Sequence, residues 1–324
     1  MPQSVSPDAP VRWGILGTGA INRKLLAGAR LSGAVQVVAV ASRTQARADS
    51  FAAEHAIPHA VGSYEDLLAD PGIEAVYISL PNALHHPWTM AALASGKHVL
   101  VEKPYSSQPD EVQLAFDTAE AAGLVLSEAL MWRHHPQVAR LQAIAAELGP
   151  LQVIRASFCF AQEGAADVRL QPGLDGGSLL DVGTYCVSGA RLLSGEEPAE
   201  VYGVATEGPT GVDVRFTGIL RFPGGVVAEF TCGFTTEHRG LEAIGTRGSV
   251  LATDPWQSQP AAIVRDGMPV DVAVADPYQL EIEDVSAAIR TGRAPLVGRA
   301  ESMGQVRALE ALRRSAASGE PVRL

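Results

Sequence analysis

A lysine ends an apolar run of the sequence. HVLVEKPYSS, residues 98–107, begins like a strand buried on both faces and continues with Glu102, Lys103 and Pro104. A lysine that a buried strand carries to the edge of a sheet is partly desolvated, which suits it to proton transfer or to polarising a carbonyl. A salt bridge with a neighbouring acid is the structural alternative. Pro104 would set the turn that aims Lys103, and an X-Pro bond is the kind that can be cis.

An aspartate and a tyrosine stand four residues apart in GGSLLDVGTYC, residues 176–186. If this segment is helical, Asp181 and Tyr185 lie on one face, one turn apart. The two glycines that open it would let the helix start close to a ligand. A hydrogen bond on a helix surface is the other interpretation. Arg169, in DVRLQP, is a candidate second substrate contact or, equally, half of a surface ion pair.

GTGAIN, residues 17–22, directly follows the first apolar run. Gly17 and Gly19 occupy the first two places of a GxGxxG pattern, which a dinucleotide-binding loop needs for a tight turn and for close approach to a pyrophosphate. Ala20 and Ile21 then open the helix whose N-terminus faces that group. Asparagine ends the motif where glycine or alanine is usual, which predicts a polar contact or a slightly displaced helix.

The end of the second apolar run indicates which dinucleotide binds. An NAD site usually carries an acid there for the ribose 2′-hydroxyl. ASRTQAR, residues 41–47, instead has Ser42, Arg43 and Thr44. An arginine with two hydroxyl groups suits a 2′-phosphate, so NADP is the expected cofactor and NAD the second possibility. The alternative is that Arg43 is a solvated loop residue.

Further candidates for the cofactor site follow the strand that precedes HVLV. Ligands of open α/β sheets bind beyond the carboxyl ends of the strands, and LPNALHH, residues 80–86, lies at such an end. Pro81 and Asn82 would shape the loop near the nicotinamide ribose. His85 is a candidate contact, or it supports the next helix. Glu102 would either contact the nicotinamide side or hold the neighbouring lysine in place.

The elements that carry these residues change character along the chain. From residue 11 to about 130, short apolar runs alternate with amphipathic helices, a rhythm typical of a parallel, doubly wound sheet. After residue 150, longer strands with partial alternation predict a mainly antiparallel sheet, and helices return near the C-terminus. The fold is therefore expected to be α/β. A Rossmann domain would occupy residues 1–130, and an α+β domain with a large open sheet, for substrate binding and oligomerisation, residues 131–324.

Composition disfavours several classes of protein. The formal net charge of −11 disfavours nucleic-acid binding, and no apolar run approaches the ~20 residues that cross a bilayer. Cys159, Cys186 and Cys232 form no CxxC pair, so we expect buried thiols and no metal site. The first residues lack the pattern of an export signal, which favours the cytoplasm.

The chain resembles the Gfo/Idh/MocA family of oxidoreductases in the motifs GTGAIN, EKP, EALMWRHHPQ and GGSLLDVGTYC, and the resemblance covers nearly its whole length. It implies that Lys103 is catalytic and that Asp181 lies in the substrate pocket. Tyr185 stands where many relatives have histidine. In this it is similar to the branch of glucose-fructose oxidoreductase, NADP-dependent xylose and dihydrodiol dehydrogenases and sugar 3-ketoreductases. By the same resemblance, Trp132 and Arg133 would lie against the nicotinamide.

The implied reaction is a reversible hydride transfer between a nicotinamide and a hydroxyl or carbonyl carbon of a sugar, polyol or sugar derivative. Tyr185 would take or give the hydroxyl proton, with Lys103 nearby and Asp181 orienting the substrate. Two alternatives stay open: a lyase or glycosidase that uses a bound cofactor for transient oxidation, and a non-catalytic dinucleotide-sensing regulator. The resemblance also favours a homodimer or homotetramer through the C-terminal sheet, with no nucleic-acid or membrane partner.

Overall fold

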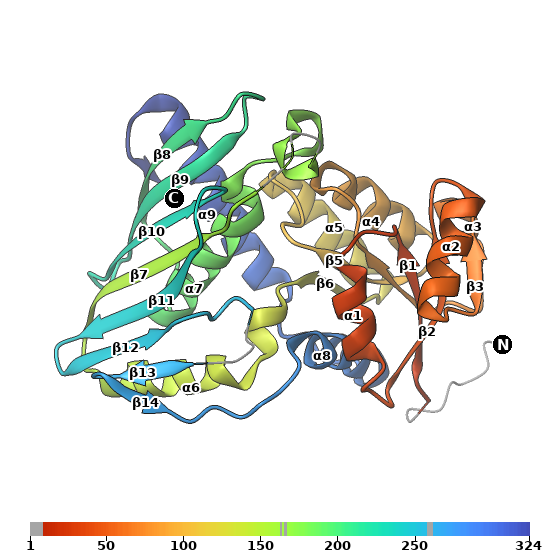
Figure 1. Ribbon diagram of the computed structural model, residues 1–324, viewed down its shortest axis with the longest axis horizontal. Coiled ribbons are helices and arrows are strands. Elements are labelled where there is room, and N and C mark those ends of the chain that lie inside the picture. Colours follow the sequence, from red (N-terminus) through yellow and green to blue (C-terminus); the bar gives the residue numbers. More distant parts are fainter. Residues whose placement is uncertain (1–8, 163, 165–166, 258–261) are drawn as a thin grey trace. The chain divides into compact units, whose positions relative to one another are not determined.

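The computed structural model describes residues 9–162, 164, 167–257 and 262–324. They form two compact units, whose helices and strands are labelled in Figure 1. The first unit reaches to Ser106 and adds Asp110–His134 and Asp276–Ser302. The second consists of Ser107–Pro109, His135–Ala275 and Met303–Leu324.

A six-stranded parallel sheet forms the centre of the first unit, in the order β3-β2-β1-β4-β5-β6. The strand order reverses between β1 and β4, which is the place where open α/β sheets bind ligands. Every residue of β4 is buried, as expected of a central strand in an α/β sheet, and the edge strand β6 is equally buried. This confirms the predicted Rossmann sheet. The strands are β1 (Val11–Leu16), β2 (Val35–Ala41), β3 (His59–Val61), β4 (Ala75–Ile78), β5 (His98–Glu102) and β6 (Leu126–Ala129).

Helices connect these strands, and one further helix joins them from far along the chain. α8 (Pro277–Thr291) lies beside α1 (Figure 1), and Trp13 Nε1 of β1 donates a hydrogen bond of 3.1 Å to Ser286 Oγ of α8. The predicted boundary near residue 130 assigned this segment to the second domain, because its sequence shows a helix but not the sheet on which the helix packs. The other helices are α1 (Asn22–Ala29), α2 (Gln45–His55), α3 (Tyr64–Ala69), α4 (His85–Ala94) and α5 (Pro109–Ala122), with 3₁₀ turns η1 (Asn82–Leu84) and η2 (Met131–His134).

Gly28→Ala is expected to lower the free energy of unfolding by about 1–3 kcal/mol. An added Cβ would lie 2.8 Å from the carbonyl carbon of Tyr278 and closer still to the nitrogen of Gln279, and these backbone atoms of α8 cannot swing aside as a flexible side chain can. Urea unfolding measures the change. Gly33→Ala is the matched control, since a Cβ there meets nothing within 4 Å. Equal stabilities for the two variants would contradict this close packing of α8.

The described part of the second unit holds a nine-stranded sheet in the order β14-β13-β12-β11-β7-β10-β9-β8-β15. Neighbouring strands are antiparallel except for β7 and β10, which are parallel, so the predicted mainly antiparallel sheet is confirmed. The strands are β7 (Leu151–Cys159), β8 (Glu200–Glu207), β9 (Asp213–Arg221), β10 (Val227–Gly233), β11 (His238–Gly245), β12 (Gly248–Ala252), β13 (Ile263–Arg265), β14 (Met268–Val270) and β15 (Val322–Arg323).

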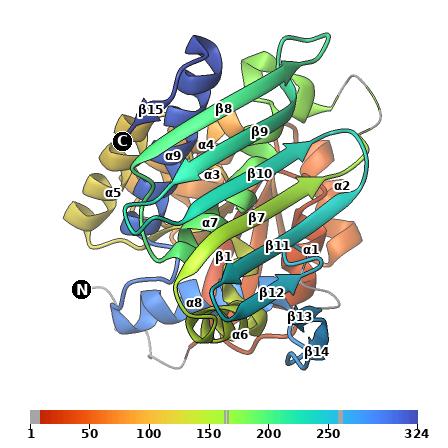
Figure 2. The ribbon, with the colours of Figure 1, turned by 90° about the vertical axis from the view of Figure 1, so that its left-hand side faces the viewer.

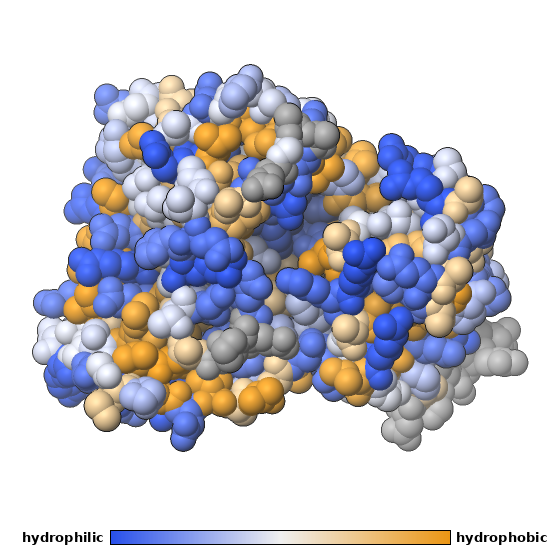
Figure 3. All heavy atoms as spheres, viewed as in Figure 1, coloured by the Kyte–Doolittle hydropathy of each residue, from blue (hydrophilic) through white to orange (hydrophobic). Residues whose placement is uncertain are grey.

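This sheet has one covered and one open face. α7 packs against β7, β10 and β11, while no described helix of this unit crosses the face turned to the viewer in Figure 2. β9 alternates accordingly: Phe216 and Leu220 are buried, whereas Arg215 and Ile219 are exposed. Figure 3 shows hydrophobic surface at the lower left, around β14, where Met268 is exposed. The helices are α6 (Pro136–Glu147), α7 (Thr184–Ser194) and part of α9 (Arg299–Ser318), with short turns η3 (Val168–Leu170), η4 (Pro172–Leu174) and η5 (Leu179–Gly183).

Candidate active site

The turn after β1 has the geometry of a dinucleotide-binding loop. Gly17 has a φ of +104°, a conformation that L side chains rarely adopt. A Cβ on Gly19 would meet only the Ser79 carbonyl oxygen, at an ordinary 3.5 Å, so packing inside the protein does not itself require glycine there. The missing side chain instead leaves the backbone open to a ligand. Ile21 is the N-cap of α1, and the predicted polar contact of Asn22 is present: Nδ2 donates to the Gly17 carbonyl oxygen at 2.9 Å.

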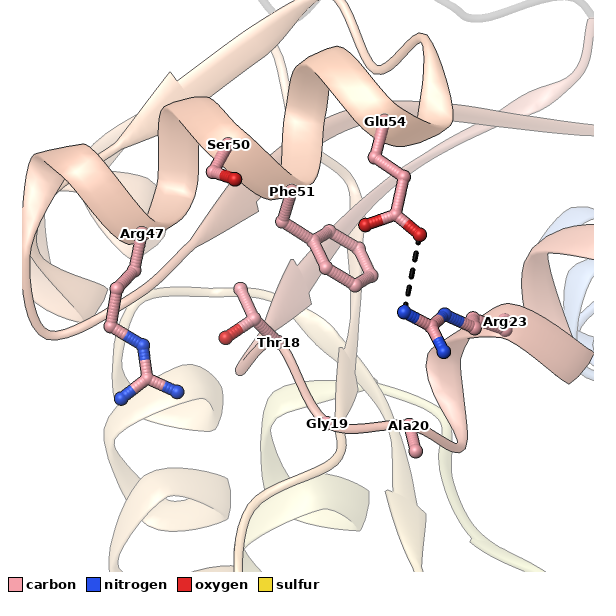
Figure 4. A pocket seen from close by; sticks show the side chains of 8 residues that line it. All are labelled: Thr18, Gly19, Ala20, Arg23, Arg47, Ser50, Phe51 and Glu54. Atoms are coloured by element: carbon pink, nitrogen blue, oxygen red, sulfur yellow. Dashed lines mark hydrogen bonds and ion pairs between the residues drawn. The ribbon is translucent and has the colours of Figure 1, made fainter.

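A hollow of about 350 Å³ lies beside this loop (Figure 4). Phe51 points from α2 toward the loop, and Arg23 of α1 pairs with Glu54 at 3.2 Å. Arg47 extends from α2 on the other side of Thr18 (Figure 4). A guanidinium beside a glycine loop suits the adenosine end of a dinucleotide that carries a ribose phosphate. The hollow is lined by Thr18, Gly19, Ala20, Arg23, Arg47, Ser50, Phe51 and Glu54.

Arg43 and Arg47 are two arginines that act on one phenol. Ser42 is buried at the end of β2, and Arg43 and Thr44 are exposed. Burial raises the pKa of Tyr64, and Arg43 and Arg47 act in the opposite direction, so both guanidiniums lie within electrostatic reach of one phenol. Sequence reasoning missed Arg47, although it follows Arg43 by only four residues in the same segment, ASRTQAR.

The carboxyl end of β5 presents Lys103 at the same edge of the sheet as the glycine loop, because β1, β4 and β5 are parallel neighbours. The Lys103–Pro104 peptide bond is cis. Glu102 accepts hydrogen bonds from the Tyr77 hydroxyl and, at 3.3 Å, from the Lys103 backbone nitrogen. Burial first, and then Glu102, raise the pKa of Tyr77 well above its usual value, so this phenol stays protonated and donates to Glu102. These contacts favour the role of Glu102 as a residue that holds the lysine segment in place.

A second acid approaches Glu102 from α8. Glu281 is 1% exposed, and burial, followed by Glu102 and Asp284, raises its pKa well above the usual value. Burial and the negative charge of Glu102 both disfavour the ionised form, so Glu281 is the neutral one of these two acids. Sequence reasoning missed Glu281 because Glu102, the acid near it at the end of β5, lies far away in the chain.

His85 supports the loops on either side of it. It is 1% exposed, and its ring nitrogens lie 2.8 Å from the Pro104 carbonyl oxygen and 2.7 Å from that of Leu80. Both polar atoms therefore face the backbone after β4 and β5, in agreement with the supporting role weighed for this histidine. Pro81 precedes η1 and Asn82 begins it.

The tryptophan and arginine of η2 are enclosed within the first unit. Trp132 is fully buried. Arg133 Nη1 lies 2.9 Å from Glu301 Oε2, and its side chain is 9% exposed. Arg133 thus has an anionic partner from α9, and contact of either residue with a nicotinamide stays a prediction.

Asp181 and Tyr185 stand out on a buried helix of the second unit. The helix opens with the π-helical turn η5 and continues as α7, which confirms the helical prediction. From Gly177 to Arg191, all of which are described, only these two side chains are not buried. Tyr185 packs edge-on against Phe158, with ring centroids 5.3 Å apart. The phenol and the carboxylate are therefore the partly accessible side chains of this helix, and their contact with a substrate stays a prediction.

The start of this helix is held by an aspartate from β9. Asp213 Oδ2 accepts hydrogen bonds of 2.7 Å from Ser178 Oγ and from the Leu179 nitrogen. Gly177 has a φ of +126°, and a Cβ there would collide with Asp213 Oδ1. Glycine is thus required both by its backbone conformation and by the cap. Sequence reasoning explained the glycine by ligand approach and missed Asp213, which lies on a distant strand.

Arg169 forms an ion pair with Asp181, which is itself a candidate site residue. Its Nε donates to Asp181 Oδ2 at 2.8 Å.

Cys159, Cys186 and Cys232 are free and buried. Among the described residues, no group of three or more histidine, cysteine, aspartate and glutamate side chains could hold a metal ion.

Two family models match the chain. One, described as an oxidoreductase family with an NAD-binding Rossmann fold, matches residues 11–130, and the GFO/IDH/MocA C-terminal domain matches residues 138–251. D-xylose 1-dehydrogenase (NADP(+)) 2 of Haloferax volcanii is 39% identical over 96% of this chain and 99% of its own. Trans-1,2-dihydrobenzene-1,2-diol dehydrogenase of Sus scrofa is 37% identical over 76% of this chain and 75% of its own.

Solved structures resemble the whole fold. A 3-ketoreductase from Actinomadura kijaniata in complex with NADP and TDP-benzene has a TM-score of 0.89 and 27% identity over 94% of this chain and 98% of that one. An aldose-aldose oxidoreductase from Caulobacter crescentus in complex with glycerol has a TM-score of 0.91 and 25% identity over 97% of this chain and 100% of that one.

Proposed function

The chain belongs to the Gfo/Idh/MocA family of oxidoreductases, and on that premise we propose that it transfers a hydride between NADP and a sugar, polyol or sugar derivative. The relatives named above are sugar or diol dehydrogenases and sugar reductases, which favours this reaction over a lyase or glycosidase. The observation that carries the proposal is the partial exposure of Asp181 and Tyr185, while every other side chain along the described helix from Gly177 to Arg191 is buried.

Each candidate residue would have its own role in this chemistry. A dinucleotide whose pyrophosphate is held by the glycine loop would supply the hydride acceptor or donor through its nicotinamide. Tyr185 would take the hydroxyl proton when the substrate is oxidised and return it when the carbonyl is reduced. Lys103 would stabilise the negative charge that develops on the reacting oxygen, and Asp181 would orient the substrate by accepting its hydroxyl hydrogen bonds.

A substrate screen tests this function directly. Free sugars, polyols and glycosides are offered with NADP⁺ and with NAD⁺, and nicotinamide absorbance is followed. Net cofactor reduction by a sugar or polyol is the expected result. A sugar product formed without net reduction would instead identify transient oxidation, and NADP-dependent binding of a protein partner without any turnover would identify a dinucleotide-sensing regulator.

Arg43→Ala and Arg47→Ala are each expected to weaken NADPH binding about tenfold or more while changing NADH binding little. Arg47 lines the hollow beside the glycine loop, and Arg43 acts on the same Tyr64 phenol as Arg47. Each charge-assisted hydrogen bond to a 2′-phosphate contributes about 1.5–3 kcal/mol. Fluorescence titration with the two reduced cofactors measures the effect. Arg30→Ala, which removes an exposed guanidinium bonded to the His55 carbonyl, is the control. Equal losses for both cofactors, or none, would reject the 2′-phosphate site.

The open face of the second sheet is the proposed site of self-association. Tyr202, Val204, Ile219 and Val227 on β8, β9 and β10 are between 36% and 51% exposed, and Tyr202 stands opposite Ile219 in the sheet. Exposed apolar side chains on neighbouring strands of a half-polar face suit a symmetric contact with a second copy of the chain.

Ile219→Glu is therefore expected to shift the protein toward monomer, because it places a charge in the middle of that contact. Sedimentation velocity measures the mass, and an unchanged oligomeric state would contradict the proposed interface.

No helix among the described residues is long and apolar enough to span a membrane. A cytoplasmic location stays a prediction, which cell fractionation tests.

A further inference from the structure

Arg169 is held between two carboxylates. Its Nε donates to Asp181 Oδ2 at 2.8 Å, and its Nη1 lies 3.3 Å from both carboxylate oxygens of Asp167. The Arg169 backbone nitrogen also donates to Asp167 Oδ1, at 2.8 Å. Two of the three nitrogens of the guanidinium are therefore committed to acids of the protein.

The surrounding backbone keeps this arrangement in place. Asp167 caps the short turn η3, and its Oδ2 also accepts a hydrogen bond of 3.0 Å from Gln162 Nε2. The Arg169 carbonyl oxygen accepts from the Gly177 nitrogen at 2.8 Å, directly before the helix that carries Asp181. The three charged side chains, which we call the acidic clamp, thus form one unit with the start of that helix.

In the acidic clamp, the carboxylates of Asp167 and Asp181 both contact the guanidinium of Arg169. Burial would lower the pKa of Arg169, but Asp181 and Asp167 outweigh burial and raise it, so the guanidinium stays charged. The carboxyl groups are the less exposed partners, with Asp181 at 13% and Asp167 at 23% of their side-chain area against 40% for Arg169.

We propose that the acidic clamp selects an uncharged polyhydroxyl substrate and rejects sugar phosphates and sugar acids, with Asp167 as the residue that sets this preference. The inference rests on the proposed function, because it concerns the substrate of the site formed by Asp181 and Tyr185. It assigns to Asp167 a role in specificity, exerted through Arg169, rather than a role in proton transfer.

The chemistry of the clamp explains the preference. Arginine is the usual receptor for carboxylates and phosphates because its parallel N–H groups match two oxygens at once. Here Nε and Nη1 already serve Asp181 and Asp167, so an anionic substrate that bound this guanidinium would either displace one carboxylate or lie beside both. Hydroxyl groups, in contrast, donate to carboxylate oxygens without any such conflict. An unfavourable charge next to the binding groups is a common way to exclude the wrong ligand.

The test compares D-glucose with D-glucose 6-phosphate and D-glucuronate in the NADP⁺-loaded protein. Binding is measured as ligand-induced thermal stabilisation, which needs no turnover, and kcat/KM is measured for every sugar that reacts. We expect wild type to prefer glucose about tenfold or more over either anion. Asp167→Asn keeps the shape of the side chain, removes one charge and should reduce that preference several-fold. Asp271→Asn removes the same charge from an exposed position after β14 and should leave the preference unchanged.

The outcomes separate this inference from the function on which it rests. Equal binding of glucose and of an anionic sugar by wild type would overturn the inference while leaving the oxidoreductase function intact. A preference that is the same in Asp167→Asn and in wild type would overturn the role of Asp167. Preferential binding of glucose without turnover of any sugar or polyol would refute the proposed function but support the clamp, and binding of none of the three would overturn the inference while the substrate screen still decides the function. If Asp167→Asn does not fold, the wild-type comparison alone still decides the preference for uncharged sugars.

Discussion

Tyr185→Phe is expected to lower kcat by about a hundredfold or more in both directions of the reaction, with NADPH binding unchanged. The substitution removes only the hydroxyl that would exchange the substrate proton, while the ring keeps its edge-on contact with Phe158 at 5.3 Å between centroids. Packing of the helix, which is buried around this residue, should therefore survive. Steady-state kinetics and fluorescence titration of NADPH measure the two quantities separately.

The matched control for this variant is Tyr202→Phe. It removes the same hydroxyl from the open face of β8, where Tyr202 is 36% exposed and far from any proposed chemistry. We expect its turnover to stay within a few-fold of wild type. Turnover of Tyr185→Phe in that same range would reject Tyr185 as the proton donor and acceptor. A loss of NADPH binding would instead indicate a structural effect.

Lys103→Met is the second variant with a large expected effect, a fall in kcat of about a hundredfold or more. Methionine keeps the length of the side chain but carries no charge, so the oxygen that becomes negative in the transition state loses its cation. The fall should appear in kcat more than in KM, because the interaction strengthens as charge develops. Kinetics with a substrate identified in the screen measure both constants.

Lys97→Met is a control of the opposite kind. Lys97 Nζ donates to the backbone carbonyl oxygens of Asp70 and Ile73, at 2.6 and 2.8 Å, so it ties the loop before β4 to the sheet. Its loss should lower the urea midpoint of unfolding and leave kcat of the folded protein unchanged. If Lys103→Met behaved like Lys97→Met, the charge at the end of β5 would be structural, as the salt-bridge alternative holds.

Local sequence patterns were sufficient to predict much of the first unit. The glycine loop, the strand that ends at Lys103 and the alternation of strand and helix are all encoded within short windows of sequence, because each β-α step joins neighbours in the chain. The same holds for Asp181 and Tyr185, whose spacing of four residues already places them on one face of a helix. Short elements were missed where they carry little periodicity, as in β3 (His59–Val61) and α3 (Tyr64–Ala69).

Interactions between distant parts of the chain could not be predicted from the sequence. Glu281 and Glu102 influence each other although 179 positions separate them, and Asp213 caps a helix that begins 34 positions earlier. Arg169 illustrates the point best, since the sequence left it undecided between a substrate contact and a surface ion pair. The structure shows an ion pair whose partner, Asp181, is itself a candidate for substrate binding.

The class of fold, the dinucleotide loop, the lysine after β5 and the spacing of Asp181 and Tyr185 could all be predicted from the amino-acid sequence. These features depend on backbone conformation and on side-chain periodicity over a few residues, which neighbouring residues dictate. Which charges face one another became visible only in the folded chain: Arg43 and Arg47 near one phenol, neutral Glu281 near Glu102, and the two carboxylates around Arg169. The physical reason is that such pairings arise when the sheet and its crossing helices close loops of many residues, and no local pattern records which side chains that closure brings together.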